Sequence, residues 1–264
     1  MTIQTFPLEK IQKVRRFISN GLTVTANLET WTGSGSDDAG ELPEPESIDE
    51  LGHLFSVGSF SELDDDAQSA HSQGKWLIST ADIAGVLIKL PGLTLKPGIR
   101  LVSYLYRIQD DGIGVVWALP EKYSHTAQLE DALTQAGDRQ QYPKPTGVLD
   151  DVMEAIEGDR SHASFLMASI LRRELQEFGA VGRSRNWGHH RLISTLPAQV
   201  SKQLGSEPRD FSPRVRLLPD ARAAVEFFSC RITPPHQIFR HVDQYPPNRY
   251  VPDSLDRLIA TAQH

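Results

Sequence analysis

Arginine, histidine and tryptophan side chains are concentrated in one short segment, from residue 182 to residue 191. Its sequence, GRSRNWGHHR, contains two glycines and predicts a loop. Planar guanidinium groups form paired hydrogen bonds with carboxylates and phosphates, and an indole ring stacks on a ligand or fills a pocket of a partner. The candidate binding residues are therefore Arg183, Arg185, Trp187, His189, His190 and Arg191.

This segment is compatible with two functions. Our leading hypothesis is a non-catalytic interaction, assembly or regulatory factor that contacts a protein partner through the loop. The alternative is an enzyme or sensor that binds a small phosphorylated or carboxylated ligand there, with His189, His190 and Arg191 in the site. A flat exposed patch centred on Trp187 would favour the protein partner, and a concave pocket would favour the ligand. A loop that pairs with internal carboxylates and buries Trp187 is the purely structural alternative.

A histidine and an aspartate also occur with the spacing of a metal site. His241 and Asp243 are two residues apart in a predicted strand, so their side chains share a face, as in the facial triad of non-haem iron sites. That triad needs a second histidine further along the chain, and only His264 follows. We therefore predict no metal site and no cofactor.

The single cysteine is a further chemical candidate. Cys230 follows Ser229 and precedes Arg231, whose positive charge would favour a thiolate. His236 or His241 would be the base of a catalytic thiol. Because a cysteine in an apolar strand is usually a small buried hydrophobe, we assign it no catalytic role.

Short catalytic motifs are missing from the sequence. It contains no phosphate-binding loop ending in Gly-Lys-Ser or Gly-Lys-Thr, no Gly-x-Gly-x-x-Gly, no Gly-x-Ser-x-Gly and no His-Glu-x-x-His. The enzyme classes that depend on these motifs are disfavoured. Catalytic groups assembled from distant positions remain an open alternative, and we name no catalytic residue.

Charge is distributed unevenly along the chain. The net charge is -7, and the stretch from Phe17 to Gly74 holds twelve acidic residues and no lysine or arginine. A sequence pI of about 5.7 argues against nonspecific nucleic-acid binding. We expect residues 32–73, rich in Gly, Ser, Pro, Asp and Glu, to form an acidic loop or arm. This arm is also expected to compete with an outside partner for the loop from Arg183 to Arg191.

Hydrophobic spacing predicts the elements that position these residues. A hairpin is expected from Arg100–Ile108 and Ile113–Leu119, joined by a Gln-Asp-Asp-Gly turn. Helices are predicted over residues 7–19, 125–136, 148–156, 161–178 with Gly179 as the stop, and 254–262. Strands are predicted over residues 22–31, 215–218, 223–233 and 236–244. Prolines bracket the last of these and predict an edge strand.

Strands and helices that occur in separate runs are typical of an α+β fold. We predict one α+β domain over residues 1–264, with mixed or antiparallel sheets from residues 76–119 and 214–244. A helical insert is expected over about 125–178, and a subdivision of the domain is conceivable near 142–146.

Composition limits the compartment. The sequence has no apolar run of the roughly 18 residues that a membrane span requires. One cysteine excludes an intramolecular disulfide. We therefore expect a cytoplasmic protein without a membrane partner.

Overall fold

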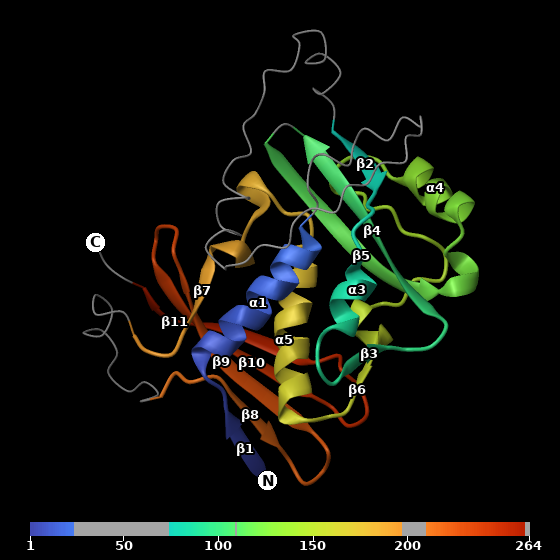
Figure 1. Ribbon diagram of the computed structural model, residues 1–264. Coiled ribbons are helices and arrows are strands. Elements are labelled where there is room, and N and C mark those ends of the chain that lie inside the picture. The colour runs from blue at the N-terminus through green and yellow to red at the C-terminus, as the bar shows by residue number, and fades with distance from the viewer. Residues whose placement is uncertain (24–73, 109, 197–209, 262–264) are drawn as a thin grey trace, which may run out of the picture. The chain divides into compact units, whose positions relative to one another are not determined.

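A computed structural model describes residues 1–23, 74–108, 110–196 and 210–261. These residues belong to one compact unit, and they have an α+β architecture in which helices pack on antiparallel sheets (Figure 1). The predicted acidic loop or arm of residues 32–73 lies outside the described residues.

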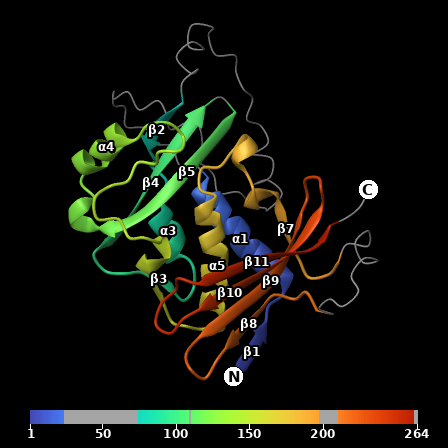
Figure 2. The ribbon, with the colours of Figure 1, turned by 180° about the vertical axis from the view of Figure 1, so that it is seen from behind.

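The large sheet is antiparallel throughout. Its strand order is β1 (Thr2–Thr5), β8 (Arg214–Leu217), β9 (Ala223–Arg231), β10 (Gln237–Tyr245) and β11 (Asp253–Thr261). A further strand, β7 (His190–Ile193), pairs with the end of β9, where His190 lies opposite Arg231. Two helices, α1 (Leu8–Leu22) and α5 (His162–Gln176), lie side by side on one face of this sheet (Figures 1 and 2).

The second sheet is built around the predicted hairpin. Strands β4 (Ile99–Ile108) and β5 (Asp111–Pro120) pair in register, and β2 (Lys75–Ile78) adds to β4. The sequence-based prediction of the hairpin is confirmed. Two short helices accompany this sheet, α3 (Ile83–Ile88) and α4 (Thr126–Gln135), and a small ribbon joins β3 (Leu93–Leu95) to β6 (Ile156–Gly158).

Helix α5 forms the centre of the core. Ser161 caps its first turn by accepting a hydrogen bond from the backbone N–H of Ser164 at 3.1 Å. Its own side chains include Phe165 and Ile170, which are fully buried in the main hydrophobic core. Gly179 has a φ of +68°, and a Cβ there would lie 2.4 Å from the Leu105 side chain, so the predicted glycine stop is confirmed.

The helix predicted over residues 148–156 is wrong. Asp151 accepts a hydrogen bond from the Met153 backbone N–H at 2.8 Å, which starts a 3-10 turn over Val152–Ala155. The chain then enters β6, so a strand separates α4 from α5 in the predicted insert.

The helix predicted over residues 254–262 is also wrong, because this segment is strand β11. Its apolar residues have helical spacing, but antiparallel pairing with β10 determines its structure. Ser254 donates to Asp243 of β10, and Asp256 accepts from Arg173 of α5. Strand β10 is therefore an interior strand and not the edge that the prolines predicted. The strand predicted over residues 22–31 starts at Leu22, which ends α1, and continues outside the described residues.

Candidate functional site

Hydrogen bonds to two carboxylates, those of Glu177 and Asp111, hold the 182–191 segment in place. It folds into two 3-10 turns, Gly182–Ser184 and Trp187–His189, and then enters β7. Glu177, just after α5, accepts the backbone N–H groups of Asn186 and Gly188. Asp111 at the start of β5 accepts the hydroxyl of Ser184 at 2.5 Å. These bonds fix the backbone of the segment, so its side chains are preorganised.

Trp187 is part of the core. Its side chain is only 7% exposed, and Nε1 donates to a carboxylate oxygen of Glu174 at 2.6 Å. The guanidinium carbon of Arg15 lies 4.3 Å from the ring centroid, and the ring also contacts Phe227 and His241. The exposed patch that would have favoured a protein partner therefore has no tryptophan at its centre.

Arginines from three parts of the chain line one cavity of about 570 Å³, which we call the arginine cavity. These residues are Arg15 and Arg16 of α1, Arg107 of β4, and Arg185 and Arg191 of the 182–191 segment. The acidic residues of its wall are Glu174 and Glu177, so the lining has a formal charge of +3 in a chain of net charge -7.

Both glutamates of the arginine cavity are already engaged. Glu174 accepts from Nε of Arg15 at 2.7 Å and from Trp187, while Glu177 accepts two backbone N–H groups. Burial raises the pKa of Glu174, and the charge and hydrogen bond of Arg15 oppose that shift. By contrast, neither the Arg16 nor the Arg185 guanidinium makes a hydrogen bond or ion pair with the described residues, and both side chains are exposed. The positive charge of the wall thus exceeds what its own carboxylates neutralise.

A second cavity, of about 490 Å³, lies on the other side of the 182–191 segment, and we call it the histidine cavity. Ser184, Asn186, Trp187 and His190 line it, whereas Arg185, Gly188 and Arg191 line the arginine cavity. The segment is therefore a partition between the two cavities. The histidine cavity is completed by His241, Arg231, Asp256, Arg173 and the aromatic side chains of Phe239 and Tyr142.

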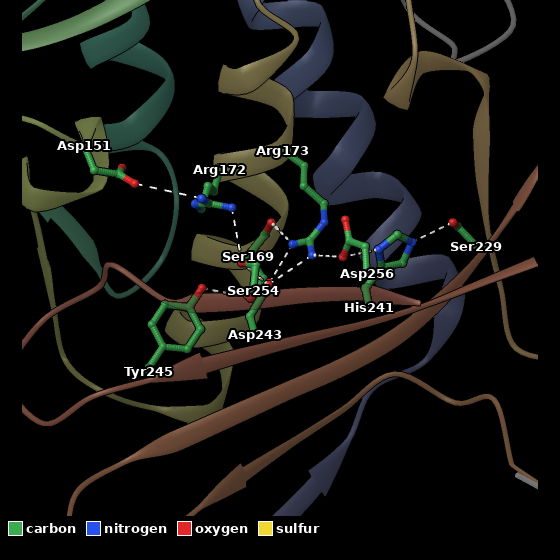
Figure 3. A network of polar contacts seen from close by, with 10 residues as sticks. All are labelled: Asp151, Ser169, Arg172, Arg173, Ser229, His241, Asp243, Tyr245, Ser254 and Asp256. Atoms are coloured by element: carbon green, nitrogen blue, oxygen red, sulfur yellow. Dashed lines mark hydrogen bonds and ion pairs between the residues drawn. The ribbon is translucent and has the colours of Figure 1, made fainter. Parts of the chain in front are cut away.

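A chain of hydrogen bonds leads to the histidine cavity. Asp256 Oδ1 lies 2.8 Å from Nδ1 of His241, and Nε2 of His241 lies 2.7 Å from Oγ of Ser229 (Figure 3). The same Ser229 oxygen is 2.8 Å from Nδ1 of His190. Aspartate, histidine and serine are connected in the same order as in a hydrolase triad. However, Ser229 has 0% exposure, and its hydroxyl is hydrogen-bonded to both His190 and His241. The buried hydroxyl therefore connects two histidines and is not placed to attack a substrate.

The donor and acceptor roles follow from the carboxylate. Asp256 accepts the proton on Nδ1 of His241, which leaves Nε2 of that ring to accept the Ser229 hydroxyl. Ser229 then accepts the Nδ1 proton of His190, and Nε2 of His190 is unprotonated. Burial, together with the nearby positive charges, lowers the pKa of His190 to about 4, so the ring is neutral at pH 7.

A buried arginine supports this chain of hydrogen bonds. Arg173 makes two bonds to the fully buried Asp243, at 2.5 and 3.0 Å, and a third to Asp256 at 3.0 Å (Figure 3). Charge and hydrogen bonds from Asp243 and Asp256 raise the pKa of Arg173 against the effect of burial. His241 and Asp243 share a face of β10, as their spacing predicted, but each is bound to a different partner. Among residues 1–23, 74–108, 110–196 and 210–261, no cluster of histidine, cysteine, aspartate and glutamate could hold a metal ion.

The remaining candidates lie elsewhere. Arg183 is exposed and lines neither cavity, and His189 is half-buried and also lines neither. Cys230 is half-buried at the end of β9, and burial raises the pKa of its thiol, which works against a thiolate.

Several site residues were not found from the sequence. Arg15, Arg16 and Arg107 come from a helix and a strand far from the 182–191 segment, and no local pattern links them to it. Ser229 and Asp256 were missed for the same reason. The available signal was that α1 carries adjacent arginines whose spacing from Gln12 and Ser19 places them on one flank of the helix.

Comparison of the chain with protein-family models, with curated proteins and with solved structures found no match. Within the described residues, no helix has the length and apolar character that crossing a membrane requires. The site must therefore be interpreted from its own geometry.

Proposed function

We propose that this protein binds a small ligand with two or more phosphate or carboxylate groups in the arginine cavity. The observation that supports this most strongly is the convergence of Arg15, Arg16, Arg107, Arg185 and Arg191 on one concave wall. Arg16 and Arg185, which make no hydrogen bond to the described residues, can donate charge-assisted and forked hydrogen bonds to anionic oxygens, and the other three arginines add positive charge. The fixed backbone of the 182–191 segment reduces the entropy cost of binding.

The burial of Trp187 favours this small-ligand function over a protein partner. Hot spots of protein interfaces are usually exposed aromatic or arginine anchors that become buried on binding. Trp187 is already covered by Arg15 and bonded to Glu174 within the chain itself. The arginines beside it face a cavity whose volume is in the range of small-molecule sites.

The arrangement supports a binding or sensing role, and we assign no chemical step to the arginine cavity. The charged groups of its lining are five guanidiniums and the engaged carboxylates of Glu174 and Glu177. We also propose a cytoplasmic location, which the single cysteine supports.

Thermal unfolding in the presence of defined anions tests the proposed function. Inorganic tripolyphosphate and citrate should raise the melting temperature by several degrees at saturation, because a ligand at about one hundred times its Kd stabilises the folded state by about 2.7 kcal/mol. Sodium chloride of equal ionic strength is the control. The proposal would be contradicted if neither anion raised the melting temperature more than sodium chloride does.

A further inference from the structure

The histidine cavity has its own chemistry, which does not depend on ligand binding in the arginine cavity. Its wall combines the imidazole of His190 with Arg231, which lies directly opposite it across the β7–β9 pair. Residues that face one another in this way have neighbouring side chains on the same side of the sheet. The two polar side chains therefore reach the cavity together.

The role of His190 is fixed by its neighbours. Its Nδ1 is held by Ser229 at 2.8 Å, and behind Ser229 stand His241 and the Asp256 carboxylate. No described residue makes a hydrogen bond to Nε2 of His190, which is the only other polar atom of the ring. The relay gives that atom a lone pair and no proton, so the ring presents an acceptor to the cavity.

Arg231 supplies the complementary groups. Its Nε donates to the hydroxyl of Thr233 at 2.9 Å, which orients the guanidinium plane. The terminal nitrogens make no hydrogen bond to the described residues and remain donors. The pair thus offers one acceptor next to a fork of donors.

The rest of the wall suits a flat ring. The Phe239 and Trp187 rings lie 5.0 and 5.4 Å from the His190 ring, centroid to centroid, and Tyr142 lines the same cavity. Aromatic and apolar walls with few, well-placed polar groups are typical of sites for small heterocycles. The formal charges of the wall cancel, since Arg173 and Arg231 are matched by Glu177 and Asp256.

We propose that the histidine cavity binds a neutral heteroaromatic ring with an N–H next to a carbonyl, the N–H donating to Nε2 of His190 and the carbonyl accepting from Arg231. In this assignment His190 and Arg231 contact the ligand. Ser229, His241 and Asp256 are positioning residues, because they act only by fixing the tautomer of His190. A ring that carries a negative charge in place of the N–H would be rejected by the lone pair of Nε2.

Nitrogen NMR of the histidine rings tests this proposal in the full-length chain, with the His190→Gln variant used to assign the His190 signals. In the free protein His190 and His241 should both be protonated at Nδ1 only. A His190 ring that is protonated at Nε2 would overturn the proposal. The tautomers are read from the wild-type chain, and the variant serves only to assign the signals.

The probe for binding is 2-pyridone, the simplest ring with an N–H next to a carbonyl. It should shift the Nε2 signal of His190, whereas 1-methyl-2-pyridone, which keeps the ring and carbonyl but has a methyl group in place of the N–H hydrogen, should not. Equal shifts with both compounds, or no shift with 2-pyridone up to its solubility limit, would overturn the assignment. Neither compound is an anion, so failure here leaves the arginine cavity untouched, and failure of tripolyphosphate to bind leaves the histidine cavity untouched.

Ser229→Ala tests the relay itself, with Ser169→Ala as a matched control. Both hydroxyls are fully buried, but that of Ser169 bonds Tyr245 and lies outside the relay. Ser229→Ala should give His190 a mixture of tautomers and weaken 2-pyridone binding about fivefold, the effect of one hydrogen bond, while Ser169→Ala should leave both unchanged. An unchanged His190 tautomer in folded Ser229→Ala would overturn the role of the relay.

Discussion

The guanidinium of Arg15 lies over the indole of Trp187, with its carbon 4.3 Å from the ring centroid. The same guanidinium donates to the carbonyl oxygen of Trp187 at 2.7 Å and to that of His190 at 2.5 Å. Through Arg15, helix α1 therefore holds the backbone of the 182–191 segment at Trp187 and His190. One arginine both secures the partition between the two cavities and lines the arginine cavity.

Replacing Trp187 should lower the stability of the fold. Trp187→Phe keeps an aromatic ring but removes the hydrogen bond to Glu174, and it leaves a void next to Phe227. We expect a loss of about 1–3 kcal/mol in the free energy of unfolding, measured by urea denaturation. A change below about 0.5 kcal/mol would indicate instead that Trp187 is an exposed side chain with no structural role.

Breaking the buried ion pair between Arg173 and Asp243 should strongly lower the free energy of unfolding. Arg173→Met leaves the fully buried Asp243 without its two guanidinium bonds, which is expected to cost about 3–5 kcal/mol. The control is Arg222→Met, which breaks an exposed ion pair to Asp220 and should cost less than about 1 kcal/mol. Equal losses in the two variants, measured by the same urea titration, would contradict the buried network described here.

Stability should fall as the pH is lowered from about 7 towards 4. The pKa of His190 is about 4 in the folded chain, because burial and the positive charges of Arg15 and Arg231 disfavour its protonation. The unfolded chain takes up this proton near pH 6.5, so each unit of pH below that point should cost about 1.4 kcal/mol from this group. Asp256, whose pKa is lowered by His241 and Arg173 against the effect of burial, loses its contribution only below about pH 4.

His190→Gln removes this titrating group. Unfolding free energies of the variant, measured by urea between about pH 7 and 5, should have a pH slope shallower by about 1 kcal/mol per unit than those of the wild type. His241, whose pKa burial also lowers, would keep a residual slope in both proteins. Identical slopes would show that His190 does not become protonated on unfolding.

Glu177 should control the rigidity of the 182–191 segment. Glu177→Ala removes the acceptor of the Asn186 and Gly188 backbone N–H groups. Hydrogen exchange of these two amides should accelerate more than tenfold, since bonds to a charged acceptor contribute about 1.5–3 kcal/mol each. Glu121→Ala, which removes an exposed ion pair with Arg100, is the control and should leave this exchange unchanged.

Sequence patterns correctly predicted the elements that are defined by neighbouring residues, such as a turn, an amphipathic pattern or a glycine stop. The β4–β5 hairpin has its turn residues between two β-rich runs, and α5 carries an amphipathic pattern that Gly179 ends. Strand β11 was predicted as a helix because Leu255, Leu258 and Ile259 have helical spacing, and only pairing with β10 decides otherwise.

Of the candidate site, only the 182–191 segment between the two cavities could be predicted from the sequence. The 182–191 segment is identifiable from its composition, yet its side chains divide between a core, two cavities and the solvent. That division depends on contacts with Arg15, Glu174 and Glu177, which lie elsewhere in the chain. A hydrogen-bond relay through Ser229 likewise exists only after three strands have paired.

The proposed anion site is tested most directly by calorimetric titration of tripolyphosphate into two double variants of equal charge. Arg185→Gln with Arg191→Gln removes two arginines of the arginine cavity, whereas Arg183→Gln with Arg222→Gln removes two exposed arginines outside it. Two charge-assisted contacts correspond to a loss of about one hundredfold in affinity for the first variant, against less than about threefold for the second. Equal losses in both variants, or a wild-type protein that does not bind tripolyphosphate, would contradict a built anion site in the arginine cavity.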